Sequence, residues 1–591
     1  MDSMAPLLLA TIFLPTVGAF LAAASGQRAR QSALVTSLFV LAMSAILVVG
    51  FPGGAEPFAV FDLPWFGGSD GPVDIRLSLG LDGLSLWLFA LSALLTVVAI
   101  LVSWEAIDER PGTFHALLLL LETGMLGVFA ARDVILFFIF FEFTLVPLFF
   151  LIGYWGSEDR RRAAIKFFLF TMAGSVLTFL GLIAIVLWDY GHGGGRATFS
   201  IAELTRHLAE RPMDRSTQLA VFLGLFAGFA IKVPLVPLHT WLPLAHVQAP
   251  TAGSVLLAGI LLKVGTYGFV RFALPMTPDA VVFFMPWLLW LCVAGIVYGA
   301  LVALAQQDIK RLIAYSSVSH LGFCMLGVFA LNRLGIEGGV LQMVNHGLAT
   351  GGLFAVVGMI YERFHTRKID DLGGLARQFP RLATFMVILT LSSIGLPGLN
   401  GFVGEFLLLL GMFQRAWTDA PVALAAQYRV ISVVAVTGVV LGAWYMLHLV
   451  QRVFFGPWRI PAGHVEKNPK LTDLSLRESS ALGLLVVFIF WIGLQPRFFL
   501  DCMSPTLGKI LDPASRAYAR HLRADRGANQ VASERTSRAD PDSPGRQGDA
   551  SNPLVPARIE PSETPTVVLL DPLSSPNSPP AAARRGSTHV R

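Results

Sequence analysis

The sequence predicts an all-α polytopic membrane protein, and three observations lead to this prediction. Hydrophobic residues make up 54% of the 591 positions and charged residues only 14%, whereas soluble chains carry about 25% charged residues. Apolar runs of about 20 residues, the length that crosses a bilayer, recur along the chain. These runs lack the alternation of a membrane β-strand, so the helix is the structure that satisfies the backbone in lipid.

The apolar runs predict about fourteen transmembrane helices. The first run lacks the cationic start of a signal peptide, so we interpret it as the first span. The predicted spans begin near Met4, Ser32, Asp82, Phe114, Asp133, Ala163, Thr217, Pro250, Ala280, Ile309, Gly335, Arg381, Tyr428 and Leu476.

The chain divides into four regions. Residues 1–113 carry the N-terminal transmembrane helices, residues 114–455 the central core, and residues 456–511 a polar linker with the last span. Residues 512–591 are rich in Pro, Ser, Asp and Arg. Such a composition buries too little apolar surface to fold alone, which predicts a disordered tail.

Basic residues predict the orientation of the chain. Arg and Lys are more frequent in the loops that share a side with the loop between the first two spans. By the positive-inside rule, that side faces the cytoplasm. Both termini are therefore predicted to lie outside.

Composition also excludes several kinds of site. The three cysteines form no CxxC pair, so the sequence supports no iron–sulfur, zinc or disulfide framework. The net charge of +5 comes from arginines in loops and tail, which set topology, so no nucleic-acid partner is predicted. The stretch GHGGGR at residues 191–196 follows no strand and is interpreted as a flexible loop.

Two lysines lie deep in apolar runs. Lys232 occurs in LAVFLGLFAGFAIKVPLVPL and Lys263 in AGSVLLAGILLKVGTYGFV. An ammonium in the hydrocarbon core costs about 3 kcal/mol on insertion scales, so such residues face the protein interior and usually mark an ion or proton path. Both are too far from a span end to reach water along the side chain.

Four further titratable groups lie inside apolar spans: Glu142, His320, His346 and Glu405. Histidine is suited to proton transfer near neutral pH. We therefore predict a gated proton path through these six side chains and ordered water. Movement of the Glu142 carboxylate relative to Lys232 would switch whether the lysine holds its proton. His239 and His246 are possible accessory groups near a span end.

Prolines interrupt two of the spans. Pro234 and Pro237 follow Lys232, and Pro397 precedes Glu405. A helix break at this depth is tolerated where it lines a cavity or packs inside protein. Two broken helices in corresponding positions, each with an ionisable group, suggest an internal repeat of about five helices.

The stretch FAIKVPLVPLHTWLPLAHVQAPTAGSVLLAGILLKVGTYG resembles the core motif of the antiporter-like subunits of proton-pumping NADH–quinone oxidoreductase (complex I), as do DIKRLIAYSSVSHLG and VNHGLATGGLF. The similarity covers about residues 80–455 closely and 1–500 loosely. Glu405 lies in the second broken helix, where other branches of this family usually carry Lys. This favours the branch called subunit M, the counterpart of mitochondrial chain 4.

The resemblance implies a fold of fourteen helices with two inverted five-helix repeats, each built around a broken helix. It implies that Glu142 pairs with Lys232 and that Lys263 is the central relay lysine. It also implies that His320 and His346 lie along the hydrophilic axis. The tail after residue 511 departs from the family pattern.

The resemblance implies that Glu405 is the exit-side group. It further implies that the chain acts in a bacterial inner membrane beside L- and N-type paralogues. This chain would hold no redox centre, and NADH, flavin, iron–sulfur clusters and quinone would bind to partner subunits. The alternatives are a subunit of a multi-subunit cation/proton antiporter, a subunit of a membrane-bound hydrogenase-type complex, and a non-transporting scaffold.

Overall fold

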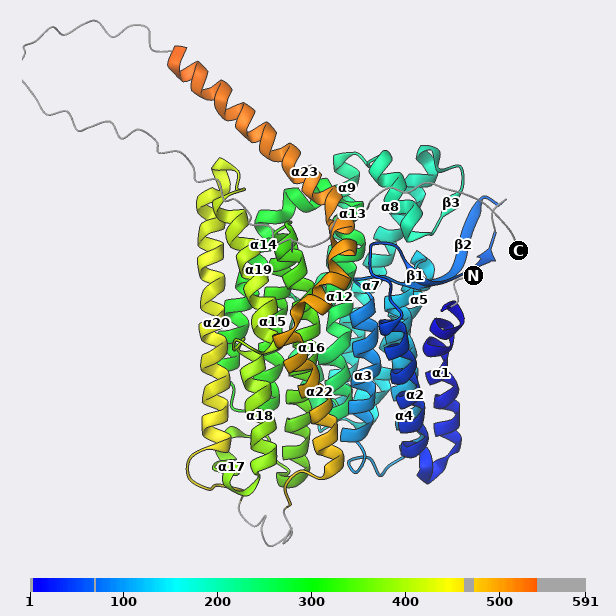
Figure 1. Cartoon of the computed structure of the whole chain (residues 1–591), viewed down its shortest axis with the longest axis vertical. Coiled ribbons are helices and arrows are strands. Elements are labelled where there is room, and N and C mark those ends of the chain that lie inside the picture. The colour runs from blue at the N-terminus through cyan, green and yellow to red at the C-terminus, as the bar shows by residue number, and fades with distance from the viewer. Residues whose placement is uncertain (1–3, 68–70, 462–471, 539–591) are drawn as a thin grey trace, which may run out of the picture. The chain divides into compact units, whose positions relative to one another are not determined.

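Long apolar helices lie side by side and make up most of the molecule, as the computed structural model shows for residues 4–67, 71–461 and 472–538 (Figure 1). Eleven of the described helices are long and apolar enough to span a membrane. The helices of Thr251–Met276 and Arg333–Phe364 are completely buried over their most apolar window, whereas Ala5–Ala24 is 39% buried. The first two therefore form the centre of the bundle, and the N-terminal helix lies at its edge.

The N-terminal part contains four helices and a β-hairpin. Their bounds are α1 (Ala5–Ala24), α2 (Ala29–Val49), β1 (Phe58–Phe66), β2 (Val73–Leu81), α3 (Leu86–Val102) and α4 (Pro111–Ala130). The next helices are α5 (Val134–Phe143), α6 (Leu145–Trp155) and α7 (Arg160–Asp189), and then come β3 (Ala197–Thr198) and α8 (Ile201–Glu210). The strands β1 and β2 pair antiparallel, and β3 joins β2 in parallel.

The central segment is interrupted several times. It contains α9 (Arg215–Lys232), α10 (Leu242–Gln248), α11 (Thr251–Leu256), α12 (Leu262–Gly268) and α13 (Leu274–Met276). π-Helical turns at Leu257–Leu261 and Phe269–Ala273 join the last three into one continuous rod. Such turns place an extra residue in the helix and often occur at functional sites.

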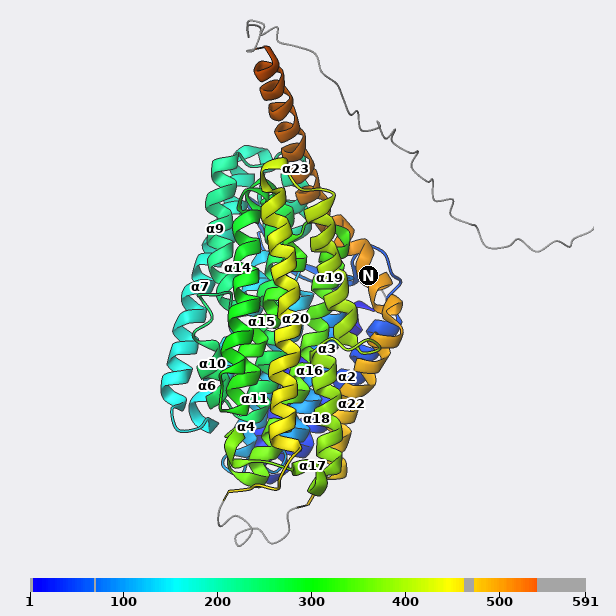
Figure 2. The same cartoon turned by 90° about the vertical axis from the view of Figure 1, so that its left-hand side faces the viewer.

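The C-terminal half contains the longest helices. These are α14 (Pro278–Leu304), α15 (Ile309–Phe329), α16 (Arg333–Phe364), α17 (Leu375–Gln378), α18 (Pro380–Ser393), α19 (Asn400–Trp417), α20 (Ala425–Phe454), α22 (Leu476–Leu494) and α23 (Pro496–Arg538). Figure 2 shows α14, α15, α19 and α20 as neighbouring, nearly parallel helices.

Each of the fourteen predicted span starts lies within about one helical turn of an observed helix start. The predicted all-α polytopic class is confirmed. Glycines allow the closest helix contacts: a Cβ on Gly338 would lie 2.4 Å from the backbone nitrogen of Leu408. Small residues at such contacts are typical of helix packing in membranes. The two inverted repeats stay a prediction.

Helix α23 corrects the predicted tail. We expected disorder from residue 512, but residues 512–538 continue α23, and Ala514, Ala517 and Tyr518 are buried. The error has a physical cause: a few apolar side chains on one face of a polar helix suffice when another surface is available to bury them. The rest of the predicted tail, residues 539–591, lies outside the described residues.

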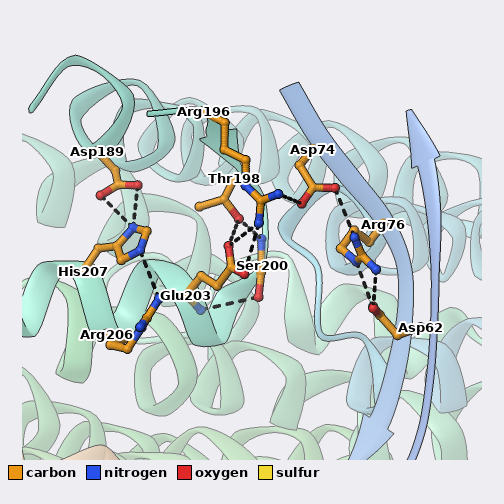
Figure 3. Close-up of polar contacts among 10 residues, drawn as sticks. All are labelled: Asp62, Asp74, Arg76, Asp189, Arg196, Thr198, Ser200, Glu203, Arg206 and His207. Atoms are coloured by element: carbon orange, nitrogen blue, oxygen red, sulfur yellow. Dashed lines mark hydrogen bonds and ion pairs between the residues drawn. The ribbon is translucent and has the colours of Figure 1, made fainter. Parts of the chain in front are cut away.

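A polar network fastens the β-hairpin to the neighbouring loop and α8 (Figure 3). Arg76 pairs with Asp62 at 2.6 Å and with Asp74 at 3.4 Å. Arg196 pairs with Asp74 at 3.3 Å and with Glu203 at 3.4 Å. Each arginine thus bridges two carboxylates, and the ion pairs form a network rather than isolated contacts.

The same hairpin fixes the start of α5. Asp133 accepts hydrogen bonds from the backbone N–H groups of Arg76 at 3.1 Å, Ile135 at 2.8 Å and Leu136 at 3.2 Å. Burial raises the pKa of Asp133 to about 6, although these N–H groups act in the opposite direction. The side chain is therefore a carboxylate at neutral pH and caps the helix that carries Glu142.

Candidate functional site

The first helix break lies directly after Lys232. Helix α9 ends at this lysine, and α10 begins at Leu242. Pro234 and Pro237 lie between the two helices, as predicted. The Trp241 indole N–H donates to the carbonyl oxygen of Ile231 at 2.9 Å, which satisfies one of the acceptors that the break leaves free.

The second break lies between α18 and α19 and contains Pro397, also as predicted. Gly395 has a φ of +70° in this break. A Cβ at this position would lie 2.6 Å from Oε2 of Glu405. The glycine thus serves two needs, because it adopts the left-handed backbone and leaves room for the carboxylate.

Lys263 lies at the centre of the bundle and is completely buried. It follows the π-helical turn Leu257–Leu261, and its ammonium donates to the carbonyl oxygen of Ala258 within that turn. Its Nζ lies 2.7 Å from Nδ1 of His346 on α16. The ammonium therefore has one fixed acceptor and one partner that can accept or return a proton.

A line of titratable groups continues from His346. The His346 and His320 rings have centroids 5.6 Å apart. Nδ1 of His320 lies 3.4 Å from Oε1 of Glu405, and its Nε2 lies 3.2 Å from the Ser393 hydroxyl and 3.4 Å from the Tyr445 hydroxyl. Both histidines and Glu405 are at most 6% exposed. The structure therefore brings four of the six predicted side chains into one buried row.

A small cavity lies between the two histidines. Its volume is only about 10 Å³, counted as the space open to the centre of a water molecule. Its wall is lined by His320, Gln342, Asn345, His346, Ala349, Thr350, Ser392, Ser393 and Gly401. Nε2 of His346 is buried with no hydrogen-bond partner among the described residues. A cavity needs about 10–15 Å³ of such space to hold one water, so this one has room for about a single water molecule. That water needs two to four polar partners, and the lining contains polar side chains of the right kind.

Amide side chains hold the Glu405 end of the row in place, and sequence reasoning missed them. Gln342 donates to Oε1 of Glu405 at 3.1 Å, and Asn345 donates to Gln342 at 3.1 Å and to the Asn400 carbonyl oxygen at 2.8 Å. Gln342, Asn345 and His346 all occur within one turn and a half of α16, in the otherwise apolar stretch 338–349. That polar cluster was the available signal.

Glu142 and Lys232 form a separate pair. The Lys232 ammonium lies 4.6 Å from the centroid of the Phe141 ring, and Glu142 interacts with it electrostatically. No ion pair within 4.0 Å joins the two among the residues that the structure describes, and Oε1 of Glu142 is buried without a hydrogen-bond partner. The pair is therefore open in this structure. The helix of Lys232 packs tightly on that of Lys263, since a Cβ on Gly265 would lie 2.8 Å from the Phe229 carbonyl oxygen.

The two accessory histidines lie outside the row. His246 is completely buried and stacks on Phe354 with centroids 4.5 Å apart, and both its ring nitrogens lack partners in the described part of the chain. His239 contacts the Tyr298 ring at 5.2 Å.

Sequence reasoning also missed Glu122 on α4, a completely buried carboxylate with neither oxygen hydrogen-bonded within the described ranges. Glu122 is a lone carboxylate in an apolar run, so the sequence signal that singled out Glu142 was present at Glu122 as well.

No three His, Cys, Asp or Glu side chains converge as a metal site within residues 4–67, 71–461 and 472–538. The buried row consists of proton donors and acceptors, and its chemistry is proton transfer along hydrogen bonds.

The geometry at Gly395 gives a direct prediction. We expect Gly395→Ala to lower proton-coupled activity, because the new Cβ displaces Glu405 in addition to a backbone cost of about 1–2 kcal/mol. Gly398→Ala is the matched control, since Gly398 has a φ of +91° and open space around it. Activity should fall in the first variant and stay near the parent level in the second. Equal losses in both would show that backbone strain alone is responsible.

Comparisons with known proteins identify the family. Residues 131–431 match the family model described as NADH:quinone oxidoreductase/Mrp antiporter, TM. The chain is 38% identical to NADH-quinone oxidoreductase subunit M of Rhodobacter capsulatus, over 83% of this chain and 91% of that protein. It is 37% identical to NADH-ubiquinone oxidoreductase chain 4 of Marchantia polymorpha, over 80% and 90%.

A solved structure agrees with these relatives. A chain of respiratory complex I from Thermus thermophilus superimposes with a TM-score of 0.75 at 32% identity, covering 86% of this chain and 99% of that one. The family-model match, residues 131–431, includes both broken helices and the buried row. The chain therefore belongs to the NADH:quinone oxidoreductase/Mrp antiporter family of membrane subunits, among relatives of the subunit M and chain 4 type.

Proposed function

We propose that the chain translocates protons as a membrane subunit of an NADH–quinone oxidoreductase, through the row Lys263, His346, His320 and Glu405. The observation that carries this proposal is the buried contact of 2.7 Å between Nζ of Lys263 and Nδ1 of His346, which continues to Glu405 through His320. The relatives named for NADH-quinone oxidoreductase at 37–38% identity favour this complex over a separate cation/proton antiporter.

The row supports stepwise transfer. A proton on Lys263 passes along the hydrogen bond to His346. We place a water in the adjoining cavity as the bridge from His346 to His320, because no direct hydrogen bond joins the two rings among the described residues. His320 then faces Glu405, which Gln342 orients. The Ala258 carbonyl oxygen and the Gln342 amide position the two ends without titrating themselves.

The open Glu142–Lys232 pair acts as the switch. When Glu142 approaches, Lys232 is held as an ammonium, and when it withdraws, the desolvated lysine gives up its proton. While the pair is open, the Phe141 ring is a cation–π partner of the Lys232 ammonium. A separated pair in a tightly packed bundle is a two-state element of the kind that a neighbouring subunit can bias.

The proposal extends to the surroundings of the chain. The side whose loops carry more basic residues faces the cytoplasm, both termini lie outside, and Glu405 releases protons outward. L- and N-type paralogues are the proposed neighbours in the inner membrane. Flavin, iron–sulfur clusters, nicotinamide and quinone are assigned to partner subunits, because the relatives are named as single subunits of a larger oxidoreductase.

The switch is tested with Glu142→Gln and Lys232→Met in the assembled complex. Each change removes one charge with little change of volume, so assembly should persist while quinone reduction and proton pumping fall at least about tenfold, as for loss of a proton-transfer group. Both are measured in reconstituted vesicles with NADH as donor. The exposed Glu158→Gln serves as the control. Normal pumping in both switch variants would refute the assigned roles.

A further inference from the structure

Arg415 is a buried cation that takes no part in the proton row. It lies on α19 and is 5% exposed. Its Nε donates to the Ala330 carbonyl oxygen and its Nη2 to the Leu331 carbonyl oxygen, each at 2.7 Å. No carboxylate lies within ion-pair distance among the described residues. The charge is instead stabilised at the C-terminal end of α15, where the helix dipole is negative.

Arg415 and Glu405 lie on the same buried face of α19. The buried side chains of this helix form one stripe, which runs through Gly404, Glu405, Leu408, Met412 and Arg415. Arg415 is ten residues beyond Glu405, about 15 Å along the helix axis. Leu408 and Met412 fill the stripe between them. The guanidinium therefore lies at the end of this face that is farther from the helix break.

Helix α23 closes this end of the stripe. The Tyr518 ring lies 3.9 Å from the Arg415 guanidinium carbon, and its hydroxyl donates to the Asp419 carbonyl oxygen at 2.8 Å. Asp525 accepts from the Val422 N–H at 3.1 Å, and Arg520 pairs with Asp279 at 2.9 Å. These contacts come from the segment that the sequence placed in a disordered tail. They attach α23 to the ends of α14 and α19, and to the loop after α19 (Figure 2).

We propose that Arg415, held in place by Tyr518 of α23, is a fixed cation barrier beyond Glu405 that limits the passive flow of protons between Glu405 and the outer side. Arginine does not lose its proton in proteins, so it repels protons without carrying them. Arginines act in this way in membrane pores that exclude protons and cations. The inference rests on the proposed function, because a barrier has meaning only if Glu405 conducts.

The test uses the whole complex in sealed vesicles, without NADH and with an imposed pH gradient that is acidic on the outer side. We expect Arg415→Gln to raise the passive proton leak on the order of fivefold, the effect of removing a unit charge about 15 Å away at an effective dielectric constant of about 20. Arg415→Lys should restore a low leak, since a lysine keeps the charge. Arg429→Gln is the matched control: Arg429 is exposed, 5.9 Å from the Trp417 ring.

A second variant keeps the test decisive if Arg415→Gln does not assemble. Tyr518→Leu leaves the guanidinium in place and removes its cover, so a smaller rise in leak is expected. A leak at the parent level in Arg415→Gln, or in Tyr518→Leu where the first variant is not recovered, would overturn the barrier. The double variant Arg415→Gln/Glu405→Gln should not leak, because the conducting group is gone.

The two proposals fail in different ways. If Lys263→Met pumps normally, the chain does not conduct through the row, whatever the leak measurements show. If Lys263→Met stops pumping and Arg415→Gln has the parent leak, the row stands and only the barrier is wrong.

Discussion

Lys263→Met should abolish proton pumping and lower NADH–quinone turnover by at least about tenfold, the usual minimum for loss of a positioned proton-transfer group. Methionine fills nearly the same volume as lysine and is apolar, so the buried site has no charge to accommodate. The change leaves Nδ1 of His346 without its donor and interrupts the row at its start. The measurement is the number of protons moved per NADH oxidised in reconstituted vesicles.

Lys368→Met is the control for this change, because Lys368 is exposed in the loop after α16. It loses the same charge at the surface and should pump as the parent does. Retention of pumping by Lys263→Met would mean that protons bypass the buried row. Loss of pumping in both variants would mean that net charge, and not position, is responsible.

Glu405→Lys should also stop pumping, for a different reason. The carboxylate accepts from Gln342 and lies 3.4 Å from His320. A lysine at this position places an ammonium, which can only donate hydrogen bonds, against the Gln342 N–H and His320. Reversal of a buried, partnered charge costs about 3–5 kcal/mol. We expect loss of pumping together with a lower melting temperature of the assembled complex. Glu405→Gln should keep the melting temperature and lose only the pumping.

Glu210→Lys provides the comparison, since Glu210 is exposed at the end of α8. A charge reversal at this site should change neither property. If Glu405→Lys pumped as well as the parent, an acidic exit group would not be required. A lower melting temperature without loss of pumping would assign Glu405 a structural role alone.

The sequence predicted correctly those features for which the free-energy cost of placing a residue in an apolar helix is large. Lys232, Lys263 and Glu142 stood out because a charged group in an apolar run is costly. Both lysines are buried, and Glu142 is half-buried with one carboxylate oxygen enclosed. Pro234, Pro237 and Pro397 marked both helix breaks because proline cannot continue the hydrogen-bond ladder. These large free-energy costs depend on the local sequence, so they can be recognised without knowing which helices pack together.

Smaller effects were missed because they depend on which surfaces meet. Gln342 and Asn345 look like ordinary polar residues until α16 packs beside α19 and brings them to Glu405 and Asn400. The segment after residue 511 has a polar composition typical of disorder, and yet α23 continues to Arg538. Its few apolar side chains are buried only because other parts of the chain supply the complementary surface.

The sequence by itself determined the membrane class, the approximate starts of the long helices, the two helix breaks and the titratable groups, because each follows from the free energy of placing one residue type in lipid. Only the tertiary structure decided that Lys263, His346, His320 and Glu405 form one row while Glu142 and Lys232 form an open pair. It alone placed Tyr518 over Arg415. Distances between side chains on different helices depend on helix packing, which local sequence does not specify.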